Sequence, residues 1–186
     1  MILARWRSLP DAFSEKLLSY FRFNMTRLAV TEKQNGLHRS LPNSLKKEIA
    51  TSCYRHLLLR IAHFAEWPRA LLDEMVMLLE EEIYLEGDVV AESSVPSDGL
   101  IIIIVGVLAI YSVHNEEAGH LHEGDYVCEL CLVTDQEIRT SSLVALTPCK
   151  VLFLEKITFR KLMRSHPELF YKLKERLTEK YASQAR

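Results

Sequence analysis

The residues best suited to chemistry in this sequence surround Arg139, which is the only Lys or Arg between Arg69 and Lys150. A hydroxyl residue, Thr140, follows it directly, and a carboxylate, Glu129, precedes it by ten positions. Phosphate sites combine backbone N–H groups with a charge-assisted donor, which a guanidinium supplies. Glu129 would repel a phosphate, but it could accept hydrogen bonds from a sugar hydroxyl. The group therefore predicts a cradle for the phosphate and sugar of a nucleotide.

Two other interpretations of this stretch stay open. Arg139 could form an ordinary surface ion pair with Glu129 or Glu137, because such pairs are common and individually weak. Zinc could instead be held by two histidines and a CxxC pair within twelve residues, and these candidate ligands are His120, His122, Cys128 and Cys131. A thioredoxin-like redox role is not favoured, since no βαβ pattern surrounds the CxxC pair.

The charge of the chain falls into three blocks. Residues 1–60 carry 11 Lys and Arg against 4 Asp and Glu, residues 61–138 carry 1 against 17, and residues 139–186 carry 11 against 4. A nucleic-acid-binding domain is expected to have a basic stripe on its compact part, whereas the central block here is acidic. We therefore expect no nucleic-acid partner.

Length and composition point to a globular chain of 186 residues with one domain and an appendage. Four cysteines without a secretory signal indicate a reducing compartment. The longest uncharged run, Gly99–Val113, spans 15 residues and is too short to cross a bilayer as a helix.

The spacing of apolar residues predicts helices at both ends of the chain. They are expected over residues 11–29, 43–61, 68–79, 157–164 and 167–181, with a polar connection over 31–39. The acidic run Glu80–Glu82 would form the solvated end of the third helix. The apolar face of the second helix would carry Leu45, Ile49, Cys53, Leu57 and Leu58.

A period typical of strands occupies the middle of the chain. Gly87-Asp88 is a hairpin-type dipeptide between apolar residues, and two buried strands are expected on either side of a tight turn at Gly106. Further strands are expected over 139–146 and 149–154, and a single helical turn over 127–133. This order predicts an α+β fold built on an antiparallel roll or barrel with segregated helices.

Taken in order, these segments resemble the cyclic-nucleotide-binding domain of ion channels and related transporters, together with the helical C-linker that precedes it. The resemblance runs from about Leu9 to Tyr181. It rests on LPNSLKKEIA (41–50), YLEGDVVAESS (84–94) and GHLHEGDYVCELCLVT (119–134) followed by RTSSLVA (139–145). It implies a C-linker-like segment over 1–62 and a binding domain over 63–186, with a jelly-roll-like antiparallel β-roll and flanking helices.

The same resemblance implies roles for individual residues. The family's phosphate-binding cassette reads approximately Phe-Gly-Glu, two or three apolar residues, and Arg-Thr-Ala-Ser. Glu129 falls on its ribose-binding carboxylate, Arg139 on its cyclic-phosphate arginine, and Thr140 on a hydroxyl that can contact the phosphate or a guanine edge. Further expected contacts come from the cassette, from an apolar wall beside the purine and from the C-terminal helix that closes over the base, namely Val127, Cys128, Leu130, Cys131, Leu121 and Lys180 or Tyr181.

Two features of the cassette depart from the family pattern. Cys128 replaces the usual glycine, which adds a side chain where the backbone approaches the ligand. The loop over 135–138 is about one residue longer than usual and contains two acids.

The implied function is a regulatory module rather than an enzyme, with cAMP or cGMP as ligand and no cofactor. Binding would shift the C-terminal helix and the linker and so gate a membrane domain, with the module at the cytoplasmic face of the membrane and homo-oligomers formed through the linker helices. The parent protein could be an ion channel or a sperm-type sodium/proton exchanger, and a non-binding interaction domain of the same fold is a further alternative. A hydrolase is not expected, since Ser165-His166 lacks an acid partner and a strand-turn-helix elbow.

Overall fold

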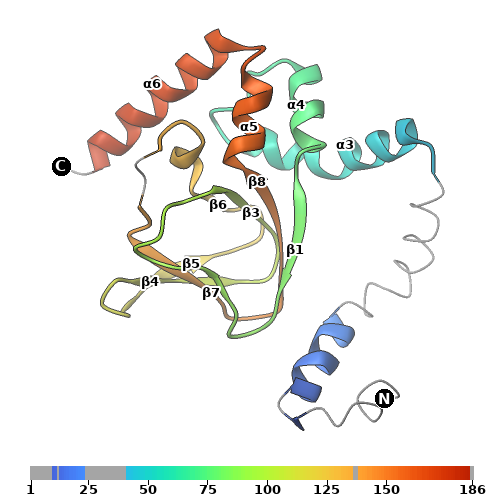
Figure 1. Cartoon of the computed structure of the whole chain (residues 1–186), viewed down its shortest axis with the longest axis vertical. Coiled ribbons are helices and arrows are strands. Elements are labelled where there is room, and N and C mark those ends of the chain that lie inside the picture. Colours follow the sequence, from blue (N-terminus) through green and yellow to red (C-terminus); the bar gives the residue numbers. More distant parts are fainter. Residues whose placement is uncertain (1–9, 12, 24–40, 136–137, 185–186) are drawn as a thin grey trace. The chain divides into compact units, whose positions relative to one another are not determined.

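The computed structural model describes residues 10–11, 13–23, 41–135 and 138–184 (Figure 1). The chain divides into two compact units, Met1–Lys46 and Lys47–Arg186. In the first unit residues 13–23 are helical, which confirms that part of the helix predicted over 11–29. Residue 11 is helical as well, whereas residues 12 and 24–29 of that prediction and the connection over 31–39 lie outside the described residues.

The second unit contains two four-stranded sheets in which every pairing is antiparallel. One sheet has the order β1 (Glu80–Tyr84), β8 (Cys149–Glu155), β3 (Gly99–Val105) and β6 (Tyr126–Val127). The other has the order β2 (Val89–Ala91), β7 (Ser141–Ala145), β4 (Leu108–Ser112) and β5 (Glu117–Leu121). Together with the flanking helices, these sheets confirm the predicted α+β fold and its antiparallel β-roll.

The tight turns of the roll connect strands of different sheets rather than hairpin partners. The turn at Gly87 joins β1 to β2, and the turn at Gly106 joins β3 to β4, although each of these strands pairs elsewhere. The hairpin indicated by Gly87-Asp88 was therefore wrong as a pairing, while the turn itself is present. Gly106 has a φ of 97°, and a Cβ there would lie 2.5 Å from the Cys149 sulfur. Only glycine fits this corner.

The helices are α3 (Asn43–Arg60), α4 (Arg69–Val76), α5 (Lys156–Met163) and α6 (Pro167–Gln184), with a short 3₁₀ turn, η1 (Glu129–Leu132), between β6 and β7. Each lies within the stretch where the sequence predicts a helix or a helical turn, or within three residues of it. The described helices include none that is both long and apolar enough to cross a bilayer.

Two details of the helix predictions were wrong. On α3, Leu57 and Leu58 are buried as expected, but Leu45, Ile49 and Cys53 are exposed, so only the last part of the stripe reaches the core. The acidic run Glu80–Glu82 does not end a helix, because it forms the start of β1. Pairing with β8 outweighs the weak helical pattern of these residues.

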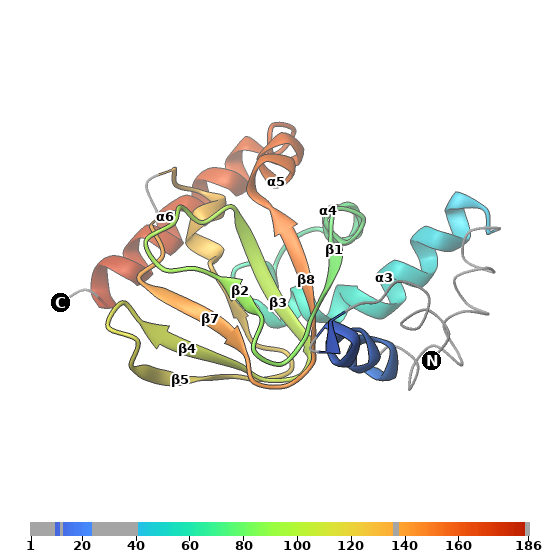
Figure 2. The ribbon, with the colours of Figure 1, turned by 60° about the horizontal axis from the view of Figure 1, so that its bottom comes forward.

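The core has two parts, of which the larger holds η1 in place. A smaller cluster fills the roll, and a larger one joins β3 and β8 to η1 and to helices α3 to α6. In the larger cluster Phe64, Trp67 and Phe159 pack together, with ring centroids of Phe64 and Trp67 4.8 Å apart. Helix α5 continues directly from β8, and α6 follows it along the same end of the roll (Figure 2). Both helices pack against η1, which carries the predicted cassette.

Candidate functional site

A pocket of about 330 Å³ lies between the roll and α6. Its wall comes from β4, β6, η1 and β7, and Tyr181 of α6 closes one side. Six of the residues named from sequence line it, namely Val127, Cys128, Leu130, Arg139, Thr140 and Tyr181. The family resemblance assigns these residues to one expected site, and in the structure they line one cavity.

Arg139 lies just before β7, and its side chain is only 11% exposed. Its Nη2 donates a hydrogen bond of 2.8 Å to Oδ1 of Asp98, whereas its Nε is buried and has no hydrogen-bond partner among the described residues. Burial lowers the pKa of Arg139, but the Cys128 thiol and the Asp98 carboxylate raise it by more, so that it lies above its usual value. The pocket wall thus contains a permanent cation with an unused donor.

The structure gives Arg139 an ion-pair partner, as one interpretation expected, but that partner is not Glu129. The partner is Asp98, which lies 41 residues away in sequence and is largely exposed. It is not Glu129, whose carboxylate bonds to another residue, and Glu137 lies outside the described residues. Asp98 could not be found from sequence, because the loop between β2 and β3 reaches Arg139 only in the folded roll.

Glu129 begins η1 and is 4% exposed. Its Oε1 accepts a hydrogen bond of 2.8 Å from Nζ of Lys180 on α6. This bond raises the pKa of Lys180, against the opposing effect of burial. The nearby His63 has a pKa below its usual value, because it is partly buried and lies close to Lys180. Lys180, which the family resemblance places on the helix that closes over the base, contacts the buried carboxylate of Glu129 in this structure.

Cys128 places a side chain in the pocket wall from an uncommon backbone conformation. Its φ is 67°, in the left-handed region that glycine adopts without strain. The thiol is half-buried, lines the cavity and lies against the Arg139 guanidinium. The backbone at this position therefore follows the course that a glycine would take, while the thiol takes up part of the space beside the cation.

The remaining predicted residues lie around the pocket rather than in its lining. Leu121 on β5 pairs with Leu108 and packs against the core of the roll. Cys131 is completely buried in the larger core. Among the described residues no three His, Cys, Asp or Glu side chains are placed to hold a metal ion, so the four candidate zinc ligands are not gathered into a site.

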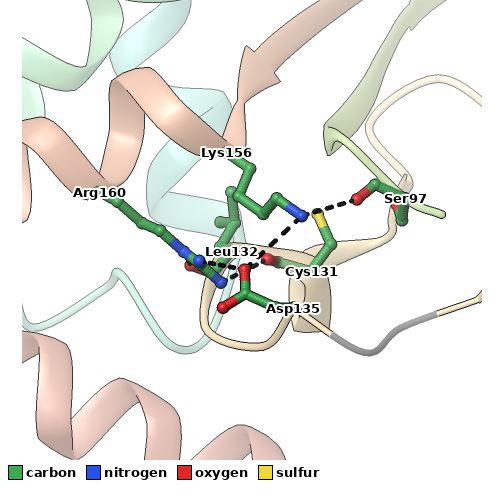
Figure 3. Close-up of polar contacts among 6 residues, drawn as sticks. All are labelled: Ser97, Cys131, Leu132, Asp135, Lys156 and Arg160. Carbon is green, nitrogen blue, oxygen red and sulfur yellow. Dashed lines mark hydrogen bonds and ion pairs between the residues drawn. The ribbon is translucent and has the colours of Figure 1, made fainter.

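Sequence reasoning missed a second group of polar contacts, which fastens the end of η1 to α5 (Figure 3). Arg160 donates from Nε to the Leu132 carbonyl at 2.8 Å and from Nη2 to the Cys131 carbonyl at 3.3 Å. Its Nη1 pairs with Asp135, and this contact holds the pKa of that carboxyl below its usual range. Helical periodicity placed Arg160 on a helix, but no local pattern indicates which carbonyls it reaches.

Comparison with known proteins identifies the family to which the central part of the chain is similar. Residues 81–166 match the family model described as the cyclic nucleotide-binding domain. This match confirms the resemblance stated from the sequence over those residues, which include the roll and α5. The match covers Glu129, Arg139 and Thr140.

Two relatives from Arabidopsis thaliana are described as putative cyclic nucleotide-gated ion channels 8 and 7. They are 26% and 25% identical to this chain over 128 residues, which is 66% of the chain and 17% of each relative. The chain therefore spans about one sixth of the length of these curated relatives. A solved structure described as cAMP-bound PfPKA-R shares the fold, with a TM-score of 0.54 and 18% identity over 72% of this chain and 49% of that one.

Proposed function

We propose that this chain binds cAMP or cGMP in the pocket between the roll and α6, because residues 81–166 match the family model of the cyclic nucleotide-binding domain. The observation that carries the proposal is Arg139, a nearly buried cation on the pocket wall whose Nε has no partner among the described residues. A buried guanidinium donor without an acceptor is costly, and the oxygens of a cyclic phosphate would satisfy it.

The other predicted residues take roles that follow from their positions. Thr140 adjoins Arg139 and would donate its hydroxyl to the phosphate or contact a guanine edge. Glu129 would accept a hydrogen bond from the ribose at the buried start of η1, where Lys180 already contacts one of its oxygens. The apolar walls would hold the sugar and the purine, and the predicted residues that line them are Val127, Cys128, Leu130 and Tyr181.

We further propose that binding regulates a membrane domain in a longer protein. The supporting observation is that the two Arabidopsis relatives are described as cyclic nucleotide-gated ion channels. Residues 1–62 would serve as a C-linker and as an oligomerisation segment, with the module at the cytoplasmic face of the membrane. The nucleotide would act by favouring one arrangement of α6 over another, and its effect is limited by its differential affinity for the two. A sperm-type sodium/proton exchanger is the alternative parent protein.

One observation favours a second candidate function, a regulatory domain that keeps the fold without binding nucleotide. Both charged residues of the proposed site already have partners within the chain, Asp98 for Arg139 and Lys180 for Glu129. A ligand would have to compete with these ion pairs or join them. A non-binding domain would not explain why the buried Nε of Arg139 has no partner in the described part of the chain.

Calorimetric titration of the purified chain with cAMP and with cGMP separates the two candidates. We expect binding, and we expect Arg139→Ala to weaken it by about tenfold to a hundredfold, which corresponds to the loss of a charged hydrogen bond. Arg164→Ala is the matched control, because it removes an exposed arginine directly after α5 that lies outside the pocket. The absence of heat with either nucleotide at millimolar concentration would contradict the proposal and favour the non-binding domain.

A further inference from the structure

Arg160 of α5 makes several polar contacts outside the proposed ligand site. Its three guanidinium nitrogens each reach a different acceptor: the Leu132 carbonyl, the Cys131 carbonyl and the Asp135 carboxylate. All three acceptors belong to the end of η1 or to the loop that follows it (Figure 3). One side chain therefore ties this segment to the helix that follows β8.

The contacts of Arg160 supply hydrogen-bond donors to the last carbonyls of η1. The last carbonyls of a helix have no partner within it and must find other donors. In η1 the Leu130 carbonyl accepts from the backbone N–H groups of Val133 and Thr134, at 3.1 and 3.2 Å. The two carbonyls that follow receive hydrogen bonds from Arg160 instead. The side chain thus continues the hydrogen bonding of η1 where the helical turn ends.

The geometry of these contacts calls for arginine rather than for any cation. A guanidinium presents several donors in one plane and can reach three acceptors at once, whereas a lysine ammonium is a single point. Lys156, one turn earlier on α5, shows the difference. Its Nζ reaches the Ser97 carbonyl at 3.3 Å and approaches Asp135 at 3.9 Å, and both contacts come from a single nitrogen.

The position of η1 decides where the proposed ribose contact lies. Glu129 is the first residue of this four-residue turn, and Arg160 holds the last one. A rigid turn held at its end fixes the carboxylate at its start, whereas a turn released from α5 would let the carboxylate move. Through the same contacts, a displacement of η1 by a ligand in the pocket would be passed on to α5.

We propose that Arg160 is a positioning residue of the site: its guanidinium fixes η1 to α5, sets the place of the Glu129 carboxylate and links occupation of the pocket to α5. The expected effect of Arg160 on nucleotide affinity rests on the proposed function. Its expected effect on η1 rests only on contacts within the chain.

The test compares variants that remove different parts of the contact. Arg160→Lys keeps the charge and can keep the pair with Asp135, but it loses the planar donors to the two carbonyls. Asp135→Asn keeps the carbonyl contacts and removes the charged partner. Leu162→Ala, on the same helix, lowers stability through packing and leaves all Arg160 contacts intact.

Two measurements are made on each variant of the full chain. Hydrogen exchange of the peptide amides over 127–134 without ligand reports on η1, and titration with cAMP or cGMP reports on the site. We expect Arg160→Lys to accelerate exchange in η1 and to weaken nucleotide binding by about tenfold, the effect of one lost charged hydrogen bond. Asp135→Asn and Leu162→Ala should stay within about twofold of the wild type in affinity, which is less than about half a kcal/mol.

Two results would overturn the inference. Arg160→Lys could keep wild-type exchange in η1, which would mean that the planar contacts do not hold the turn. Alternatively, Leu162→Ala at a matched melting temperature could lose as much affinity as Arg160→Lys, which would make Arg160 a merely structural residue. If the wild type binds neither nucleotide, the proposed function fails, and wild-type exchange rates in Arg160→Lys would separately show that η1 is not held by Arg160.

Discussion

At the scale of single residues, Cys128 shows how a sequence departure can leave the local backbone unchanged. Its left-handed conformation is uncommon for a residue with a side chain and is strained by about 1–2 kcal/mol relative to a right-handed one. The surrounding turn, held by η1 and the core, maintains that conformation. The thiol then occupies space beside Arg139 that a glycine would leave open.

Cys128→Gly should therefore raise nucleotide affinity with little effect on stability. Relief of the left-handed strain is offset by the greater flexibility of glycine in the unfolded chain, so the free energy of unfolding should change by less than about 1 kcal/mol. Calorimetric titration and urea denaturation measure the two quantities. A lower affinity in Cys128→Gly would show that the thiol supports the site through its contact with Arg139.

The residues of the site differ in how well sequence could predict them. Arg139, Glu129 and Thr140 could be identified because charge isolation and chain order single them out in a short stretch. Asp98 and Arg160 could not, because they reach the site from other elements and their contacts depend on tertiary packing. Local sequence patterns do not predict contacts between residues that lie far apart in the sequence.

At the scale of elements, α6 is tied to the roll through one buried carboxylate. Glu129 is almost fully buried, and Lys180 supplies its charged partner from a partly exposed position. Helix α6 also buries Leu173 and Leu177 in the larger core, so the ion pair extends a contact that apolar packing begins. The last turns of the helix are thereby held beside the pocket.

Lys180→Met should destabilise the chain by about 1–3 kcal/mol, because a buried carboxylate loses its charged donor. The effect should depend on pH. The folded state raises the pKa of Lys180, so the contribution is complete below the usual lysine pKa of about 10.4 and is lost as pH rises through the higher folded value. Urea denaturation of wild type and variant at pH 8 and pH 11 checks this expectation. Adding Glu129→Gln should recover part of the loss, and a difference that stays equal at both pH values would contradict the charge argument.

Sequence patterns predicted the positions of strands and turns better than they predicted which strands pair with each other. The strands around Gly106 and the turn at Gly87 were recognised from β-branched runs and from glycine. Yet β1 and β2 lie in different sheets, as do β3 and β4, and each of these four strands pairs with a strand far away in sequence. A corner and a hairpin require similar turn residues, and only the packing of two sheets against one core distinguishes them.

At the scale of the whole molecule, an aromatic cluster joins the segment before α4 to α5. Phe64 and Phe159 are fully buried, and Trp67 stacks on Phe159 with an angle of 15° between the rings. The cluster lies in the core that also holds η1, so the helical layer and the candidate site share one set of apolar contacts.

Phe159→Ala should lower the free energy of unfolding by about 3–5 kcal/mol, the usual effect of removing a buried phenylalanine. Ile157→Ala is the matched control, since this residue of the same helix is 70% exposed and should change stability by less than about 0.5 kcal/mol. Thermal unfolding followed through tryptophan fluorescence measures both. Equal melting temperatures for the two variants would contradict the role of the cluster.

Strand β1 lies at the end of its sheet order and pairs only with β8 among the described strands. An open strand edge offers unpaired backbone groups to any other extended chain and is a common starting point for aggregation. Here the edge begins with three consecutive glutamates, Glu80–Glu82, whose charges would repel a second edge of the same kind. The acidic run is therefore expected to oppose edge-to-edge pairing between neighbouring copies of the chain.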